Sequence, residues 1–313
     1  MSSIRVFDAR HVEESLPPAV AVEAIRNAFV AHARGEWAMP PKLYLTNYPA
    51  GDFRAMPALG NGHALLKWVT SFPGNPARGL PTVGGAVLLS NAETGELEAL
   101  LDAGAVTALR TGAAAVLAAE TLARGDARSA CVIGAGPNGR AVARTFIARG
   151  RAVALFDIDT GRAARAAAEL DATVAGSVEE ALGADILVTV TPGHRILLAE
   201  GALHRGQHVS LMGADGPGKA EIAAAELART VLFCDDWEQA SHSGDIARVV
   251  ESGQITRPDV TELGAVLTGD APGRQSRDER TVFDSTGLAI QDLAVAIACI
   301  ERADELDVPS IDL

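Results

Sequence analysis

The chain has 313 residues, 48% of them hydrophobic, which favours two domains of ordinary size with well-filled cores over disorder. Its formal net charge of −13 makes nucleic acid and anionic lipid poor partners, because those surfaces demand clustered Lys and Arg. Its three cysteines lack metal-ligand and redox-pair spacing, and its seven histidines form no HxH or HExxH pattern, so we expect no metal site.

Two segments bear on location. Met1–Leu16 carries mixed charges and no continuous apolar run, unlike a secretory signal or a basic, Ser-rich leader, so we expect a cytoplasmic protein. The Ala-rich segment Ala103–Ala119 is interrupted by Arg110 and Thr111. It falls short of the apolar length that a membrane span needs, so we expect no membrane role.

The part of the chain before residue 115 is rich in Pro and Gly and has strand-like runs at 64–70 and 83–90, which predicts a separate α+β domain. A helix-like stretch, 103–123, then ends at Arg124-Gly125-Asp126, a plausible cap and linker. A last helix-like stretch, 288–306, has apolar residues at helical spacing and is expected to return to this first domain.

Between these parts, short apolar runs alternate with Ala- and Arg-rich stretches that have the length of crossover helices. This alternation is typical of an α/β fold with a doubly wound parallel sheet. The domains predicted from it are residues 1–124 with 288–313, and residues 125–287. The apolar runs are 131–133, 153–156, 186–190, 209–212 and 231–234.

A glycine-rich sequence, Gly134-Ala135-Gly136-Pro137-Asn138-Gly139, follows the first of these runs and opens a helix. In a dinucleotide fingerprint the first glycine allows a tight turn, the second lets the backbone approach the pyrophosphate, and the third permits close helix–strand packing. In this context the sequence predicts an NAD(P)-binding Rossmann domain, the alternative being a glycine turn without a ligand.

Asp157 ends the next apolar run, about 20 residues beyond the glycines, where a carboxylate can bind the adenosine ribose and repel a 2′-phosphate. This favours NAD, with NADP as the less favoured cofactor. Asp157 could instead merely end a strand, and Arg162 nearby could neutralise a 2′-phosphate.

Two charged residues stand in apolar settings. Lys67 lies in a strand-like run and Arg110 is the sole charge between Asp102 and Glu120, so each should face a carboxylate of the protein or of a ligand. Purely structural roles, an edge lysine and a structural ion pair, remain open for both.

Asp215 follows the run 209–214, at the carboxyl end of a predicted parallel strand, where open α/β sheets gather ligands. That position suits an acid–base group, but the sequence Asp215-Gly216-Pro217-Gly218 is equally a turn signal. Since no GxSxG, P-loop or SxxK pattern is present, redox chemistry is favoured over hydrolysis and phosphoryl transfer.

Several separated motifs, in order along nearly the whole chain, resemble the ornithine cyclodeaminase and mu-crystallin family. They are Thr107-Ala108-Leu109-Arg110-Thr111, the glycine-rich sequence, Gly213–Lys219 and Phe283-Asp284-Ser285-Thr286-Gly287, with support from Met56-Pro57-Ala58 and Gly287–Asp292. The resemblance implies a homodimer whose substrate-binding and dimerisation domain is built from both chain ends around an inserted Rossmann domain.

The resemblance also implies roles for these residues. Lys67 and Arg110 would hold a substrate carboxylate, with Lys42 the nearest match for a further basic contact, and Asp215 would act at the amine or imine nitrogen. We also expect Met56 at the substrate, and Thr111 and Thr191 at the cofactor.

The function expected is therefore NAD(P)-dependent oxidation or reduction of an amino or imino acid, with hydride transfer at the substrate Cα by a dehydrogenase or ketimine reductase. Ornithine cyclodeamination, which gives L-proline and ammonia, is the alternative, and a non-catalytic ligand-binding protein is the second. Arg54 stands before Met56-Pro57, where cyclodeaminases are expected to place an acid, and would repel a distal ammonium. A lone arginine in a loop points to solvent by default, and Asp52 could supply the acid if the loop turns it inward.

Overall fold

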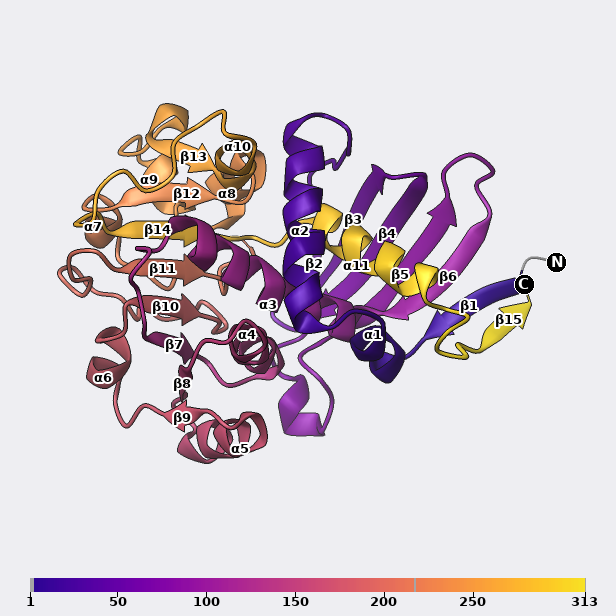
Figure 1. Ribbon diagram of the computed structural model, residues 1–313, viewed down its shortest axis with the longest axis horizontal. Helices are drawn as coiled ribbons and strands as arrows, with labels where there is room; N and C mark the ends of the chain where they lie inside the picture. The colour runs from indigo at the N-terminus through magenta and orange to yellow at the C-terminus, as the bar shows by residue number, and fades with distance from the viewer. Residues whose placement is uncertain (1–2, 217, 313) are drawn as a thin grey trace. The chain divides into compact units, whose positions relative to one another are not determined.

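A computed structural model of the chain describes residues 3–216 and 218–312 (Figure 1). The described residues form two compact units. The first takes the residues up to Arg110 and those from Leu288 onward, and the second spans Thr111–Gly287. The division falls inside helix α3 (Ala103–Leu122), whereas the sequence placed the linker after the helix, at Arg124-Gly125-Asp126.

The first unit is a seven-stranded sheet in the order β15-β1-β6-β5-β4-β3-β2, antiparallel except for the parallel pair β1 and β6. Helices α2 and α11 pack together, and α11 lies against β3 and β4 (Figure 1). Its elements, with a 3-10 turn at Asn75–Arg78, are β1 (Ser3–Phe7), α1 (Ala9–Ser15), α2 (Pro18–Ala33), β2 (Leu43–Asn47), β3 (Gly51–Gly60), β4 (His63–Ser71), β5 (Val83–Asn91), β6 (Leu97–Asp102), α11 (Ala289–Glu301) and β15 (Ser310–Asp312).

The second unit is an eight-stranded parallel sheet in the order β13-β12-β14-β11-β10-β7-β8-β9 (Figure 1). Its elements, with a 3-10 turn at Arg257–Asp259, are β7 (Ala130–Ile133), α4 (Pro137–Ala148), β8 (Val153–Phe156), α5 (Thr160–Leu170), β9 (Thr173–Val174), α6 (Val178–Leu182), β10 (Ile186–Thr189), β11 (His208–Leu211), α7 (Ala224–Leu227), β12 (Val231–Cys234), α8 (Trp237–Ser243), α9 (Ala247–Glu251), β13 (Val260–Glu262), α10 (Leu263–Thr268) and β14 (Thr281–Asp284).

The predicted α/β class with a Rossmann-type parallel sheet is confirmed. All five apolar runs are strands, because strands covered on both faces need continuous apolar sequence. The strand order reverses at β7, whose neighbours are β8 on one side and β10 on the other. Ligands of such sheets bind at this switch point, beyond the carboxyl ends of the strands.

The expectation about the Ala-rich segment needs correction. Among the described residues, α3 is one continuous helix of 20 residues, and an 18-residue stretch of it has a mean hydropathy of 1.2, so the helix is long and apolar enough to cross a membrane. Neither Arg110 nor Thr111 interrupts it. In the folded protein, 78% of this apolar stretch is buried, as is usual for a core helix.

Candidate active site

The glycine-rich loop lies directly after β7, at the switch point of the parallel sheet. Gly134 has φ +109°, and a Cβ there would lie 2.4 Å from the Val190 carbonyl oxygen. A Cβ on Gly139 would lie 1.7 Å from the Gly134 carbonyl oxygen. The backbone itself therefore requires both glycines, Gly134 for the tight turn and Gly139 for the close contact between helix and strand.

Gly136 differs, because no atom lies within 4 Å of a Cβ built on it. It is the N-cap of α4, it makes no side-chain capping bond, and Pro137 and Asn138 form the first turn. An uncapped helix N-terminus with open space at the second glycine fits a bound pyrophosphate.

Asp157 lies just beyond β8 and is tied to the same loop. Its Oδ2 accepts the Ala135 N–H at 2.8 Å, its Oδ1 accepts the Asp159 N–H at 2.9 Å, and Arg162 Nη1 lies 3.3 Å from Oδ2. Asp157 is buried, whereas the Arg162 side chain is half exposed. Both groups weighed for the cofactor choice thus lie together at the end of β8.

Thr191 follows β10 and is held by Glu221. Its N–H and its hydroxyl donate to Glu221 Oε1 at 3.0 and 2.6 Å. Thr111, the other threonine expected at the cofactor, is buried in α3, and its hydroxyl has no hydrogen-bond partner among the described residues. An unpartnered buried hydroxyl is uncommon in folded proteins and is consistent with a ligand contact.

Asp215 lies in the loop after β11 and forms an ion pair with Lys219, at 2.5 Å between Oδ1 and Nζ. Its side chain is partly exposed, as a group that exchanges protons with a substrate must be. Pro217, part of the same motif, lies outside the described residues.

In the first unit, Lys67, Arg110 and Asp292 meet in the interior. Lys67 Nζ donates to Asp292 Oδ1 at 2.9 Å, and Arg110 Nε lies 3.5 Å from the same oxygen. Arg110 also donates to Gln291 Oε1 at 3.3 Å. The side chains of Lys67 and Asp292 are 2% and 0% exposed. Two cations therefore share one carboxylate, which leaves one positive charge uncompensated within this trio.

Burial lowers the pKa of Lys67 from 10.5 to about 8, with the attraction of Asp292 opposing this and the charges of Arg110 and Arg54 adding to it. A lysine with a pKa near 8 can hold an anion and can also exchange a proton close to neutral pH.

Arg54 and Asp52 lie in β3, not in the predicted loop, and of the two alternatives for Arg54, solvent or interior, the structure shows the interior. Arg54 is 6% exposed, and its Nε donates to Asp52 Oδ1 at 2.6 Å. The Arg54 guanidinium carbon lies 5.4 Å from the centre of the Tyr44 ring. Asp52 does turn inward, but it faces this arginine.

Met56 is buried and pairs directly with Lys67 across β3 and β4, so the two side chains share one face of the sheet. Lys42 lies in the segment between α2 and β2 and is partly exposed. Of the residues expected at the substrate, Lys67, Arg110, Arg54 and Met56 are thus all buried in the first unit.

Sequence reasoning gave no role to Asp292, Gln291 or Glu221. Asp292 carries the signal that drew attention to Arg110, a lone charge inside an apolar helix, and could have been found by the same argument. Glu221 follows a Gly- and Pro-containing turn in which a charged residue is unremarkable.

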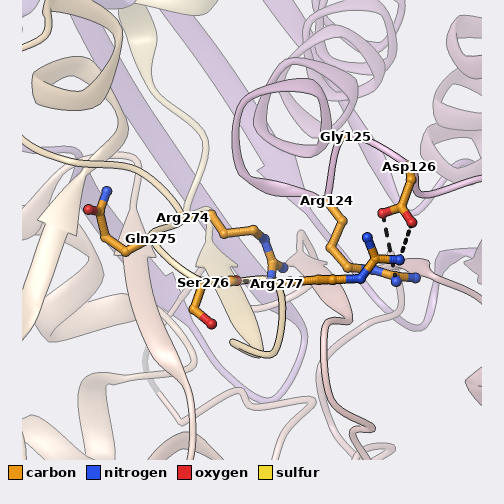
Figure 2. Close-up of a pocket in the computed structure, with 7 residues that line it drawn as sticks. All are labelled: Arg124, Gly125, Asp126, Arg274, Gln275, Ser276 and Arg277. Carbon is orange, nitrogen blue, oxygen red and sulfur yellow. Dashed lines mark hydrogen bonds and ion pairs between the residues drawn. The ribbon is translucent and has the colours of Figure 1, made fainter.

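A cavity of about 400 Å³ opens at the amino ends of the parallel strands, lined by residues 124–126 and 274–277 (Figure 2). Its arginines are already engaged. Arg124 and Arg277 both pair with Asp126 (Figure 2). Arg274 donates to four carbonyl oxygens, those of Leu122, Gln207, Ser276 and Glu279, and to the Thr281 hydroxyl. These bonds use all five N–H groups of Arg274, so we assign this cluster to fold stability.

Comparison with known proteins gives a consistent picture. A sequence model of the ornithine cyclodeaminase/mu-crystallin family matches residues 5–307. The alanine dehydrogenase of Archaeoglobus fulgidus is 40% identical over 307 residues, which cover 95% of this chain and 94% of that protein.

Two solved structures share the fold along the full length. An archaeal alanine dehydrogenase dimer with bound NAD has a TM-score of 0.94 and 38% identity, covering 100% of both chains. The Thermococcus litoralis Δ1-pyrroline-2-carboxylate reductase, in complex with NADH and L-proline, has a TM-score of 0.92 and 27% identity, covering 99% of this chain and 100% of that one.

Proposed function

The chain belongs to the ornithine cyclodeaminase/mu-crystallin family, and from that premise we propose that it is an NAD-dependent oxidoreductase of small amino or imino acids. The observation that carries the proposal is the buried trio of Lys67, Arg110 and Asp292, with two cations on one carboxylate. Its single uncompensated charge matches the α-carboxylate of an amino acid, which Arg can bind bidentately.

The cofactor would be held by the glycine-rich loop and the uncapped N-terminus of α4, with Asp157 near the ribose. NAD, when bound, would supply hydride exchange with the substrate Cα through its nicotinamide C4. The NAD and NADH bound in the two related structures support this choice over NADP. Thr111 and Thr191 are proposed as additional cofactor contacts.

The protein's own groups would do the remaining chemistry. Lys67 and Arg110 would neutralise and orient the substrate carboxylate, which fixes the reacting carbon. Asp215 would take a proton from the amine during oxidation and return one during reduction, the work of a general base and acid. Lys67, with its pKa near 8, is a second candidate for proton exchange.

The substrate is proposed to be small, with alanine first, because the alanine dehydrogenase relative is 40% identical over nearly the whole chain. Ornithine cyclodeamination is the second candidate, favoured by the buried carboxylate of Asp52, whose charge is the one that would attract a distal ammonium. Arg54 already donates to both oxygens of that carboxylate, at 2.6 and 3.4 Å. We therefore rank ornithine cyclodeamination below amino acid dehydrogenation.

The test is a substrate panel with the purified protein. L-Alanine, L-proline and L-ornithine are supplied with NAD, and pyruvate with ammonium and NADH, while NADH absorbance, ammonia and proline are followed. NADH formation with alanine supports the proposal. Proline and ammonia from ornithine with catalytic NAD would move the assignment to cyclodeamination, and binding without turnover would move it to a ligand-binding protein.

We further propose a homodimer formed through the outer face of the first sheet. Leu43, Leu45, Leu59, Leu66 and Trp68 lie on one face by their register, yet are 38–56% exposed. Such a contiguous apolar face is typical of an interface, and the archaeal relative is described as a dimer. Light scattering should give a dimer for the wild type and a smaller species for Leu66→Glu. A monomeric wild type would exclude this interface.

We propose a cytoplasmic location because the cysteines Cys131, Cys234 and Cys299 are free and buried. Reduced thiols persist in that compartment. Cell fractionation tests it.

A further inference from the structure

We propose that Glu221 is a positioning residue for the reaction, acting through the loop that carries Asp215 and the strand end that carries Thr191. The inference rests on the proposed oxidoreductase function for its catalytic meaning. Its structural part concerns the second unit alone.

Glu221 is 0% exposed, and both of its carboxylate oxygens are used. Oε1 accepts the Thr191 N–H at 3.0 Å and the Thr191 hydroxyl at 2.6 Å. Oε2 accepts the Gly213 N–H at 2.9 Å and the Thr189 hydroxyl at 2.6 Å. One side chain thus bridges the carboxyl ends of β10 and β11.

The same bond closes the loop that presents Asp215. Gly213 and Glu221 stand at the two ends of this loop, and the Glu221 carboxylate accepts the Gly213 N–H. Inside the loop, Lys219 pairs with Asp215. The position of Asp215 is therefore set between two anchors, a closed loop base and an ion pair.

The backbone leaves little room for another arrangement. A Cβ on Gly213 would lie 2.4 Å from the Thr191 carbonyl oxygen and 2.6 Å from Glu221 Cδ. The Ala220 N–H donates to the Gly193 carbonyl at 2.8 Å, and the Glu221 N–H donates to Asp245 Oδ1 at 2.5 Å. The segment after β10 and the loop after β11 are packed as one piece, with the Glu221 carboxylate at its centre.

A positioning role follows from geometry. Proton transfer needs donor and acceptor within hydrogen-bond reach, and a displacement of about 1 Å can cost about 100-fold in rate. Burial raises the pKa of Glu221, and the hydrogen bonds that it accepts from two amides and two hydroxyls oppose that rise. These four bonds hold the two strand ends together, and in the ionised form they are charge-assisted and stronger than bonds to a neutral group.

The experiment compares Glu221→Gln with Glu226→Gln. Glu226 is a matched control: it is also 0% exposed and also accepts two amides, those of Gly201 at 2.6 Å and Leu203 at 2.9 Å, but it touches neither strand end. With L-alanine and NAD, Glu221→Gln should lower kcat about 10- to 100-fold with the KM for alanine little changed, and Glu226→Gln should leave kcat within about twofold.

Amide hydrogen exchange supplies a readout that does not depend on turnover. In Glu221→Gln the new amide NH2 faces a donor, so exchange in residues 189–193 and 213–219 should rise about tenfold or more, whereas Glu226→Gln should affect residues 199–203 instead. Thr189→Val, which removes one hydroxyl from Oε2, should loosen residues 213–219 in the same way and serves if Glu221→Gln does not fold.

Unchanged exchange at residues 213–219, or equal losses of kcat in the two glutamate variants, would overturn the positioning role. A wild type that turns over no amino acid would instead refute the proposed function, and the exchange data would still decide whether Glu221 holds the loop.

Discussion

Lys67 Nζ lies 2.9 Å from Oδ1 of Asp292, although 225 positions separate the two residues in the chain. The contact exists because α11, near the end of the chain, packs against β4. Neither side chain can reach water to any extent. The last helix therefore supplies the counter-charge for the buried lysine, and the charge of the trio depends on it.

Asp292→Asn should lower the free energy of unfolding by about 3–5 kcal/mol, because it leaves Lys67 and Arg110 buried without their shared anion. Urea unfolding measures the change. The control is Asp304→Asn, whose carboxylate pairs with Arg5 at the surface and should contribute far less. Equal, small changes in both variants would mean that the buried pair adds nothing to stability.

The depressed pKa of Lys67 predicts a pH dependence of stability. Between pH values near 8 and 10.5 the unfolded chain keeps the lysine proton that the folded chain has released, so stability rises with pH across this window. The difference in unfolding free energy between the wild type and Lys67→Met should grow by up to about 3 kcal/mol in favour of the wild type. Parallel stability curves over this window would argue against a lowered pKa.

Gly136→Val should abolish NAD binding while the protein stays folded, because no protein atom lies within 4 Å of a Cβ at this position and the side chain would occupy the space in front of α4 that the pyrophosphate needs. Gly125→Val is the matched control, since a Cβ there also meets nothing within 4 Å and Gly125 lies after α3. Calorimetry should show wild-type NAD affinity for the control. Retained affinity in folded Gly136→Val would remove the pyrophosphate from this loop.

The sequence was sufficient for the elements that obey local rules. The strands of the parallel sheet are continuous apolar runs, and the glycine-rich loop has a fixed spacing. Strand β3 was not predicted from the sequence, because Pro57 and the turn-forming residues before it are poor strand signals. Pro57 lies beyond Ala55, the last β3 residue paired with β2, and prolines are tolerated at such edges.

The site was predicted less completely than the fold, because its charges are decided by partners brought together in three dimensions. The sequence left undecided whether the Arg54 side chain points to solvent or into the pocket, and the structure places it beside Asp52 in β3. Asp292 and Glu221 act on groups from distant segments, and no local pattern records such contacts.

The cofactor preference should depend on Asp157 and Arg162 together. Asp157→Ser removes the carboxylate that opposes a 2′-phosphate and frees the half-exposed Arg162, so the ratio of NADP to NAD affinity should rise at least several-fold. Adding Arg162→Ala should cancel the gain. If the double variant keeps the new preference, Arg162 is not the group that receives the phosphate.

Asp215→Asn should lower kcat about 10²- to 10⁴-fold, the usual cost of removing a general acid or base, while the shape of the side chain and its loop is kept. The affinity for NAD should stay near the wild-type value, because the glycine-rich loop and Asp157 are untouched. The matched control is Asp278→Asn, an aspartate of the same unit that pairs with Arg205 at the surface, 2.6 Å away, and should leave kcat unchanged. Steady-state kinetics with L-alanine and NAD, together with calorimetric NAD binding, separates the two effects. A kcat within about twofold of the wild type would return Asp215 to the role of a turn residue paired with Lys219. Proton exchange at the substrate nitrogen would then fall to Lys67, whose pKa near 8 permits it.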